Sequence, residues 1–202
     1  MITLAIETST PRGSVALSVS GELVFSEHFQ ADRSHSSALF ASLARGRTCA
    51  QHVDEVVVGL GPGSYAGVRI GIASALSFEL ALNALPVGIP SVAALHGGAE
   101  EYLAIGDARR ETFYFAHVRG GVCLQGPKLV TETQLHALAE EKPLLPLLTS
   151  TPLRAFPAAQ IAYPSAAILA RLAERRLGIV ARGDLEPLYL REPHITRPQL
   201  HC

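Results

Sequence analysis

A glycine-rich stretch in the first half of the chain has residue types and a spacing that could bind an anion: residues 59–71 read GLGPGSYAGVRIG. A β-branched run over 54–58 predicts a buried strand before it, and residues 70–85 predict a helix after it. Glycines allow close backbone approach, and Ser64 as N-cap would leave N–H groups and the positive helix end at the loop. The loop is therefore a candidate anion site. A tight turn before a closely packed helix explains the same spacing, because neither GxGxxG nor GxxxxGK[ST] is present.

Small hydroxyl side chains follow the first predicted strand, which covers residues 2–8. Thr8, Ser9 and Ser14 could bond phosphate oxygens. They could equally cap the turn through bonds to the neighbouring backbone, as such residues often do. The pattern leaves both interpretations open.

The histidines and cysteines do not predict a metal site. Leu39 stands four residues after His35, where a helical metal pair needs a second histidine, and the other histidines are dispersed. Cys49, Cys123 and Cys202 form no CxxC pair, which favours free thiols in a reducing compartment. No serine or cysteine has a histidine and a third orienting group at recognisable spacing, so no hydrolytic constellation is evident.

Composition limits the partners that this chain can bind by itself. The chain has 202 residues, 48% hydrophobic residues and a net charge of −1, without a long basic block. Tight binding of a nucleic acid by the chain alone is therefore not expected. No apolar run reaches the roughly 18 residues that a membrane span needs, and the first residues lack a basic leader region, so we expect a cytoplasmic protein without a membrane contact.

The remaining patterns predict an α/β protein with mixed sheets flanked by helices. A meander of strands opens the chain, and strands then alternate with helices as far as about residue 100. A second meander begins near residue 102, and Thr131 with Gln134 matches a capping box. We therefore expect a first lobe over 1–100 and a shortened second lobe with an extended tail over 101–202. The predicted elements are strands at 2–8, 14–20, 22–29, 54–58, 86–89, 102–108, 111–118, 122–124 and 144–148, and helices at 34–45, 70–85, 91–95, 135–141 and 165–177.

Four motifs together resemble one known family. The run GPGSYAGVRIG at 61–71 is similar to the GPGSFTGLRIG signature of the TsaB family, also called YeaZ. AIETST at 5–10 followed by SVAL at 14–17 resembles the AIDTST…SVAL opening of that family. DARRE at 107–111 and PLYLR at 187–191 resemble its DARR and PxYxR motifs. The resemblance runs nearly from end to end.

The resemblance implies an actin-like fold of two ribonuclease H-like lobes. It also implies a noncatalytic scaffold that binds its catalytic paralogue TsaD during threonylcarbamoylation of adenosine next to the anticodon of tRNAs that read ANN codons. The ATPase TsaE and the tRNA would then be reached only through the TsaB–TsaD complex. ATP or ADP and a divalent metal would belong to that complex, with no cofactor intrinsic to this chain. For the chain alone, the resemblance leaves a monomer and a homodimer both open.

The same resemblance assigns roles to particular residues. The helix after the glycine loop and the helix before it would pack against the equivalent helices of TsaD, and we expect Ala75 to face outward in that seam. In the actin-like class the opening hairpin holds phosphate and a metal-associated Asp, whose position is occupied here by Glu7. The residues predicted to form a vestigial nucleotide or phosphate loop are Glu7, Thr8, Ser9, Ser14, Gly61 and Gly63. The predicted partner-interface residues are His35, Leu39, Ser64, Tyr65, Val68, Arg69, Ile72, Ala75 and Leu76.

Two enzymatic alternatives stand beside the scaffold. An actin-like phosphotransferase or ATPase would need acidic Mg²⁺ ligands and a base. The acidic candidates are Glu7 and Asp107, which lie near the beginning of the two lobes. A glycoprotease-like hydrolase would need a nucleophile with its base, and none stands out. Fold alone does not decide among these functions.

Overall fold

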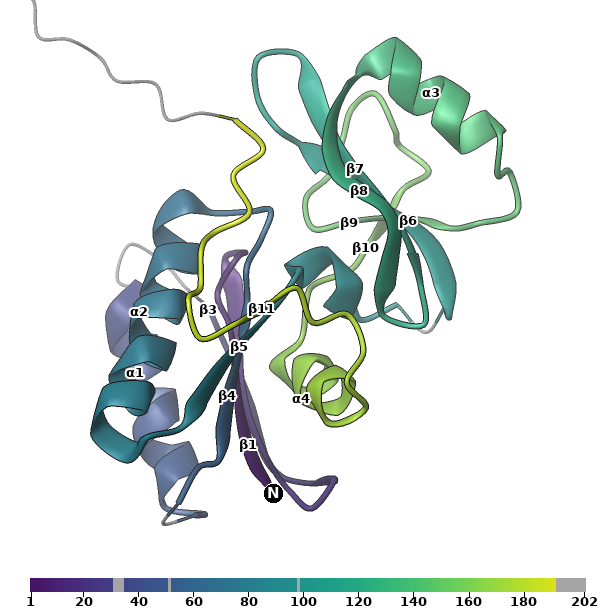
Figure 1. Cartoon of the computed structure of the whole chain (residues 1–202). Helices are drawn as coiled ribbons and strands as arrows, with labels where there is room; N and C mark the ends of the chain where they lie inside the picture. The colour runs from purple at the N-terminus through teal and green to yellow at the C-terminus, as the bar shows by residue number, and fades with distance from the viewer. Residues whose placement is uncertain (31–34, 51, 98, 192–202) are drawn as a thin grey trace, which may run out of the picture.

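The computed structural model describes residues 1–30, 35–50, 52–97 and 99–191. Two sheets form the molecule (Figure 1). The six-stranded sheet has the order β11-β5-β4-β1-β2-β3, and the five-stranded sheet has the order β10-β9-β6-β7-β8. The strands of the first sheet are β1 (Ile2–Glu7), β2 (Arg12–Val19), β3 (Glu22–Gln30), β4 (Glu55–Gly59), β5 (Leu85–Ile89) and β11 (Ala181–Arg182). Those of the second are β6 (Glu101–Asp107), β7 (Thr112–Arg119), β8 (Val122–Thr131), β9 (Leu147–Thr149) and β10 (Gln160–Ile161).

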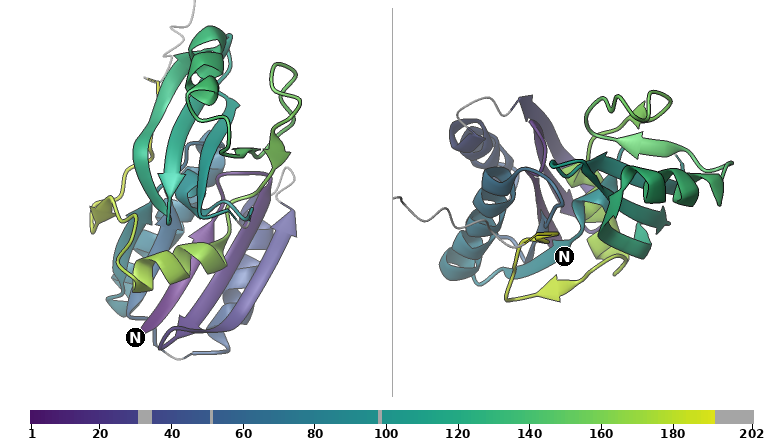
Figure 2. Two further views of the ribbon diagram at one scale, coloured as in Figure 1. Left: turned by 90° about the vertical axis from the view of Figure 1, so that its right-hand side faces the viewer. Right: turned by 90° about the horizontal axis from the view of Figure 1, so that it is seen from above.

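Both sheets are built on the same plan, as the two predicted meanders suggest. β1, β2 and β3 pair antiparallel, and β4 then joins β1 in parallel. In the second sheet β6, β7 and β8 pair antiparallel, and β9 joins β6 in parallel. The left view of Figure 2 shows the two lobes one above the other. The predicted mixed-sheet α/β class is confirmed.

Helices cover both faces of the first sheet. On one face lie α1 (His35–Arg47) and α2 (Tyr65–Leu82), and on the other lies α4 (Ala166–Glu174) (Figure 1). A short 3₁₀ helix, η1 (Ser91–Ala94), packs against α4, and α3 (Glu132–Glu140) lies on the second sheet. The completely buried Leu4, Ile6 and Val58 lie in the core beneath α1 and α2. Leu169 and Ala173 of α4 fill the opposite core with Ala5 and Val57.

The course of the chain differs from the expected lobe boundary. The prediction places residues 101–202 in the second lobe, but α4 packs on β1, β2 and β4 of the first sheet, and β11 pairs with β5 at the edge of that sheet. The physical reason is burial, because α4 has an apolar stripe that covers the face left open by α1 and α2. No local sequence pattern predicts which of the two sheets such an apolar stripe will cover.

Several element boundaries also differ from the prediction. β8 continues to Thr131, because a bulge between the pairs Phe115–Lys128 and His117–Gln125 accommodates Gly126 and Pro127 within the strand pair. The strand predicted at 14–20 begins earlier than expected, since β2 starts at Arg12. α2 begins five residues before residue 70, and the capping box at Thr131 is confirmed. Residue 34, where the first predicted helix begins, lies outside the described residues.

Candidate functional site

The glycine loop is held by its own hydrogen bonds and by the β1–β2 turn. The Ser64 hydroxyl accepts a hydrogen bond from the Gly67 amide at 3.2 Å, so Ser64 caps α2 as predicted. The Ser64 amide donates to the carbonyl of Ser9 at 2.7 Å. A Cβ at Gly63 or at Gly67 would overlap the backbone of the β1–β2 turn. The glycines are therefore required by close packing of loop on loop.

Three side chains form a cluster at the beginning of α2. The rings of Tyr65 and Tyr189 stack with centroids 5.5 Å apart. Arg69 donates to the Tyr65 hydroxyl at 2.6 Å and to the Tyr189 hydroxyl at 3.1 Å, and its guanidinium lies 5.1 Å from the Tyr65 ring centroid. The bond to Tyr189, followed by its charge interactions with both tyrosines, raises the pKa of Arg69. This Tyr65–Arg69–Tyr189 cluster ties the C-terminal segment to α2.

The C-terminal segment also connects the two lobes. The amide of Leu188 donates to the carbonyl of Leu60 at 2.9 Å, in the first lobe. Arg191 donates to the carbonyl of Arg109 at 3.0 Å and to the hydroxyl of Thr112, both at the β6–β7 turn. Sequence reasoning found this segment as a motif but predicted no contact for it. The sequence feature that could have indicated this contact is the PLYLR motif at 187–191.

α2 has a buried face and an outward face. Val68, Ile72 and Ala75 lie on the buried face and are at most 6% exposed. Gly71 lies there too, where a Cβ would meet the Thr8 hydroxyl oxygen at 2.6 Å. The small residues of this face allow the helix to pack closely on its own sheet, and they do not open a path for a foreign helix.

The expectation that Ala75 faces outward is therefore wrong, since its side chain is 0% exposed. Leu39 of α1 is also 0% exposed, so it, Val68 and Ile72 belong to the core and present no surface to a partner. The helix periodicity at 3.6 residues places 68, 72 and 75 on the same stripe, and the sheet covers that stripe. The side chain of His35 lies outside the described part of the chain.

The outward face of α2 is apolar and partly hollowed. A groove of about 610 Å³ runs between this helix and residues 185–189, and Ile70, Ala73 and Leu76 contribute to its α2 wall. Leu80 is 89% exposed, and Phe40 on the neighbouring α1 is 55% exposed. α2 is also long and apolar enough to cross a membrane by length and composition, although its inner face packs on β1, β4 and β5 as in a core helix.

The predicted phosphate-loop residues serve internal contacts. Glu7 is completely buried; its Oε1 accepts from the Ser9 amide at 2.6 Å, and burial raises the pKa of its carboxyl. The Thr8 hydroxyl donates to the carbonyl of Gly67, and the Ser14 hydroxyl accepts from the amide of Ala166. Ser9 is 2% exposed. The Thr8 and Ser14 hydroxyls are thus engaged within the chain, whereas among the described residues the Ser9 hydroxyl and Glu7 Oε2 have no hydrogen-bond partner.

Gly61 has a positive φ of 89° and donates its amide to the Ser91 hydroxyl at 3.0 Å. Among the described residues, no three His, Cys, Asp or Glu side chains lie close enough to hold a metal ion.

A cavity of about 490 Å³ lies between the lobes, bordered by Ser64, Asp107 and Arg191. The two segments that resemble family motifs at 61–71 and 187–191 therefore both border this cavity.

Two mixed sheets of common plan, with helices on both faces of the first, define an actin-like two-lobe α/β protein. The family model described as "TsaD: tRNA N6-adenosine threonylcarbamoyltransferase" matches residues 30–143, which is more than half of the chain. An uncharacterized protein of Mycobacterium tuberculosis is 32% identical over 218 residues, covering 98% of this chain and 95% of that protein.

Two further relatives have informative names. The tRNA threonylcarbamoyladenosine biosynthesis protein TsaB of Haemophilus influenzae is 36% identical over 126 residues, which cover 57% of this chain and 52% of that protein. The solved structure of YeaZ from Pseudomonas aeruginosa matches with a TM-score of 0.74 and 25% identity, covering 94% of this chain and 99% of that one. The chain belongs to the TsaB (YeaZ) family.

Proposed function

We propose that this chain is a noncatalytic subunit of tRNA threonylcarbamoyladenosine biosynthesis that binds TsaD through the outward faces of α1 and α2. The names of its TsaB relatives support the pathway. The observation that carries the binding site is the apolar outward face of α2, where Leu80 is 89% exposed and Ala73 and Leu76 border a groove. Apolar surface of this kind on a compact protein marks an interaction site.

The structure changes which residues we propose for the interface. Tyr65, Arg69 and Leu76 are retained from the sequence prediction, because the first two are exposed and the third is partly exposed. Ser64 borders them as the N-cap. Ile70, Ala73 and Leu80 of α2 and Phe40 of α1 replace the four core residues. In this proposal the Tyr65–Arg69–Tyr189 cluster holds one edge of the surface rigid before binding, which lowers the entropy lost on association.

The scaffold itself carries out no chemical step in this proposal. ATP or ADP and the divalent metal are bound by the complex, TsaE and tRNA reach this chain only through TsaD, and the cytoplasm is the site of action. The hydrogen bonds that the Thr8 and Ser14 hydroxyls make within the chain support this division of labour, because these groups are engaged in internal contacts. With a net charge of −1, the chain has little attraction for the phosphate backbone of tRNA.

Light scattering on a mixture of this chain with TsaD of the same organism tests the proposal. We expect a complex with the summed mass of the two chains, formed at the expense of any homodimer of this chain. Two separate species at micromolar concentrations would contradict the binding to TsaD.

Activity measurements on the isolated chain test the noncatalytic role. With TsaD rigorously excluded, threonylcarbamoyl-adenylate and tRNA should yield no modified tRNA, and a metal-dependent ATPase assay should give no turnover. Filter binding at physiological salt should give only weak, nonspecific tRNA affinity. Product formation or ATP turnover by the chain alone would favour the enzymatic alternatives.

A further inference from the structure

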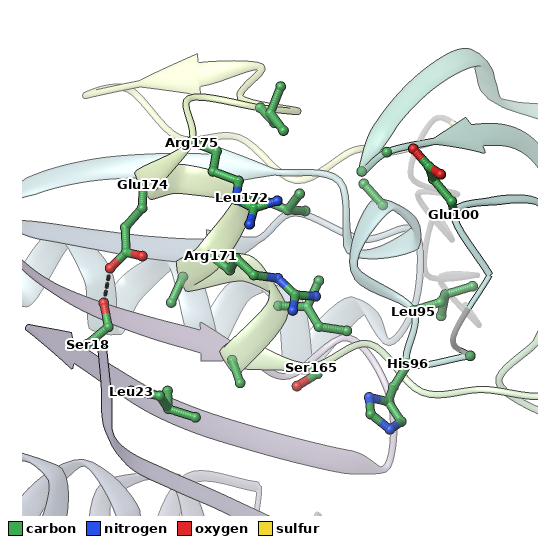
Figure 3. Close-up of a pocket in the computed structure, with 18 of the residues that line it drawn as sticks. Ser18, Leu23, Leu95, His96, Glu100, Ser165, Arg171, Leu172, Glu174 and Arg175 are labelled. Carbon is green, nitrogen blue, oxygen red and sulfur yellow. Dashed lines mark hydrogen bonds between the residues drawn. The ribbon is translucent and has the colours of Figure 1, made fainter. Parts of the chain in front are cut away.

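A second cavity lies on the opposite side of the first sheet from α1 and α2. It has a volume of about 720 Å³ and is bordered by α4, by the beginning of β3 and by the second lobe (Figure 3). Its size falls in the range of small-molecule sites. The cavity borders the face of the first sheet on which α4 packs, with Ser18 and Leu23 in its lining, whereas α2 covers the other face, so the cavity is separate from the proposed TsaD surface.

The walls of this α4 cavity are largely apolar. Leu23 of β3, Leu95 after η1, and Ile168 and Leu172 of α4 line it, together with the β7–β8 turn at Gly121. Leu23 is 52% exposed, so an apolar side chain stands open to the space. Such walls suit the hydrocarbon or aromatic part of a ligand.

Two arginines provide the charge. Arg171 and Arg175 lie one turn apart at the end of α4, and both side chains extend into the cavity (Figure 3). Among the described residues, neither guanidinium forms a hydrogen bond or an ion pair. Glu174, between them in sequence, also lines the cavity and accepts a hydrogen bond from the Ser18 hydroxyl. α4 therefore contributes two positive charges and one negative charge to the lining, and Glu100 adds a negative charge from the opposite wall.

We propose that the α4 cavity binds a small organic phosphate monoester, with the phosphate on Arg171 and Arg175 and the organic part against the apolar walls. A phosphate monoester carries close to two negative charges at pH 7 and three strong acceptor oxygens, so that one group can engage two guanidinium groups. A carboxylate has one charge and two oxygens and satisfies the pair less well. Arginine is the side chain best suited to such bidentate recognition.

Fluorescence titration with 1-naphthyl phosphate tests this proposal, because the chain contains no tryptophan whose emission would interfere. We expect a dissociation constant on the order of 1 mM or tighter for a ligand of this size. Inorganic phosphate, 1-naphthol and 1-naphthoate, used as competitors, should each bind at least about tenfold more weakly, because each lacks one part of the recognised group.

Substitutions locate the binding. The double variant Arg171→Ala/Arg175→Ala should weaken 1-naphthyl phosphate by at least about tenfold, because charge-assisted hydrogen bonds are lost. Arg154→Ala removes the charge of an exposed arginine that does not line the cavity, and it should leave the affinity unchanged. Ala167→Phe keeps the charge but fills part of the cavity, and it should also abolish binding. Circular dichroism on each variant verifies the fold.

Three results would overturn the proposal. The first is no binding of 1-naphthyl phosphate by the unaltered chain at millimolar concentrations. The second is equal affinity for the folded double variant and the unaltered chain. The third is binding of 1-naphthol or inorganic phosphate as tight as that of the ester, since the site would then not recognise both parts.

Discussion

Two alanines of α2 allow surface and core to be tested on one helix. Ala73 is exposed and borders the groove, whereas Ala75 is 0% exposed and belongs to the core beneath the helix. Positions two apart on a helix differ by about 200° in direction, so they face nearly opposite sides. Replacing each with Arg adds the same side chain to two different environments.

Ala75→Arg should destabilise the fold. The new side chain meets a filled core, and its charge has no partner there, so we expect a loss of at least about 3 kcal/mol in the free energy of unfolding. For a chain of this size that corresponds to a fall of about 6–12 °C in melting temperature. The total stability of a domain is about 5–15 kcal/mol, so a large part of the population is at risk of unfolding.

Ala73→Arg should weaken the partner complex and leave the fold unchanged. At an exposed helix position the change in stability should stay within about 0.5 kcal/mol. Within an interface, a charge that loses its water without a partner costs several kcal/mol, and about 2.7 kcal/mol already corresponds to a hundredfold loss of affinity. We therefore expect TsaD binding to weaken by at least about a hundredfold.

Thermal unfolding and light scattering with TsaD, performed on both variants, check this reasoning. A stable Ala75→Arg protein would show that the core placement of Ala75 is wrong. A stable Ala73→Arg protein that binds TsaD with normal affinity would remove the outward face of α2 from the proposed interface. Ala81→Arg, an exposed substitution further along α2, shows how far the contact extends.

Three further predictions concern stability. Tyr189→Ala removes a stacked ring and a hydrogen-bond acceptor, so the free energy of unfolding should fall by about 1–2 kcal/mol in denaturant titration, with Tyr189→Phe falling less. Arg176→Met leaves the buried Glu55 carboxylate without its 2.6 Å partner, so the free energy of unfolding should fall by about 1–3 kcal/mol. Adding Glu55→Gln to the same chain should restore part of this loss. If the double variant shows no recovery, the unpaired carboxylate is not the cause of the loss. Hydrogen bonds from Arg119 lower the pKa of Glu101 from 4.5 to about 2, so this carboxylate contributes stability above pH 4.5 that is lost as the pH falls towards 2. In acid unfolding, the difference in free energy of unfolding between the unaltered chain and Arg119→Ala should become smaller over that interval. A difference that stays constant would contradict the assignment.

Local patterns identified most elements because they depend on neighbouring residues. The strand at 2–8 and the capping box at Thr131 could be predicted from neighbouring residues alone. The N-cap at Ser64 was predictable for the same reason, as was the family, through four short motifs. The start of α2 was placed too late, because Gly67 lowers helix propensity locally and is required there by the approach of Thr8.

Tertiary structure alone decided which apolar stripe is covered. The sequence of α2 specifies two partly apolar sides, but only the position of the sheet makes Ala75 core and leaves Ala73 exposed. In the same way, α4 carries an apolar stripe that either sheet could have covered, and it returns to the first sheet. Burial depends on what packs across long separations in the chain, and helix periodicity gives only the direction of each side chain around its own axis.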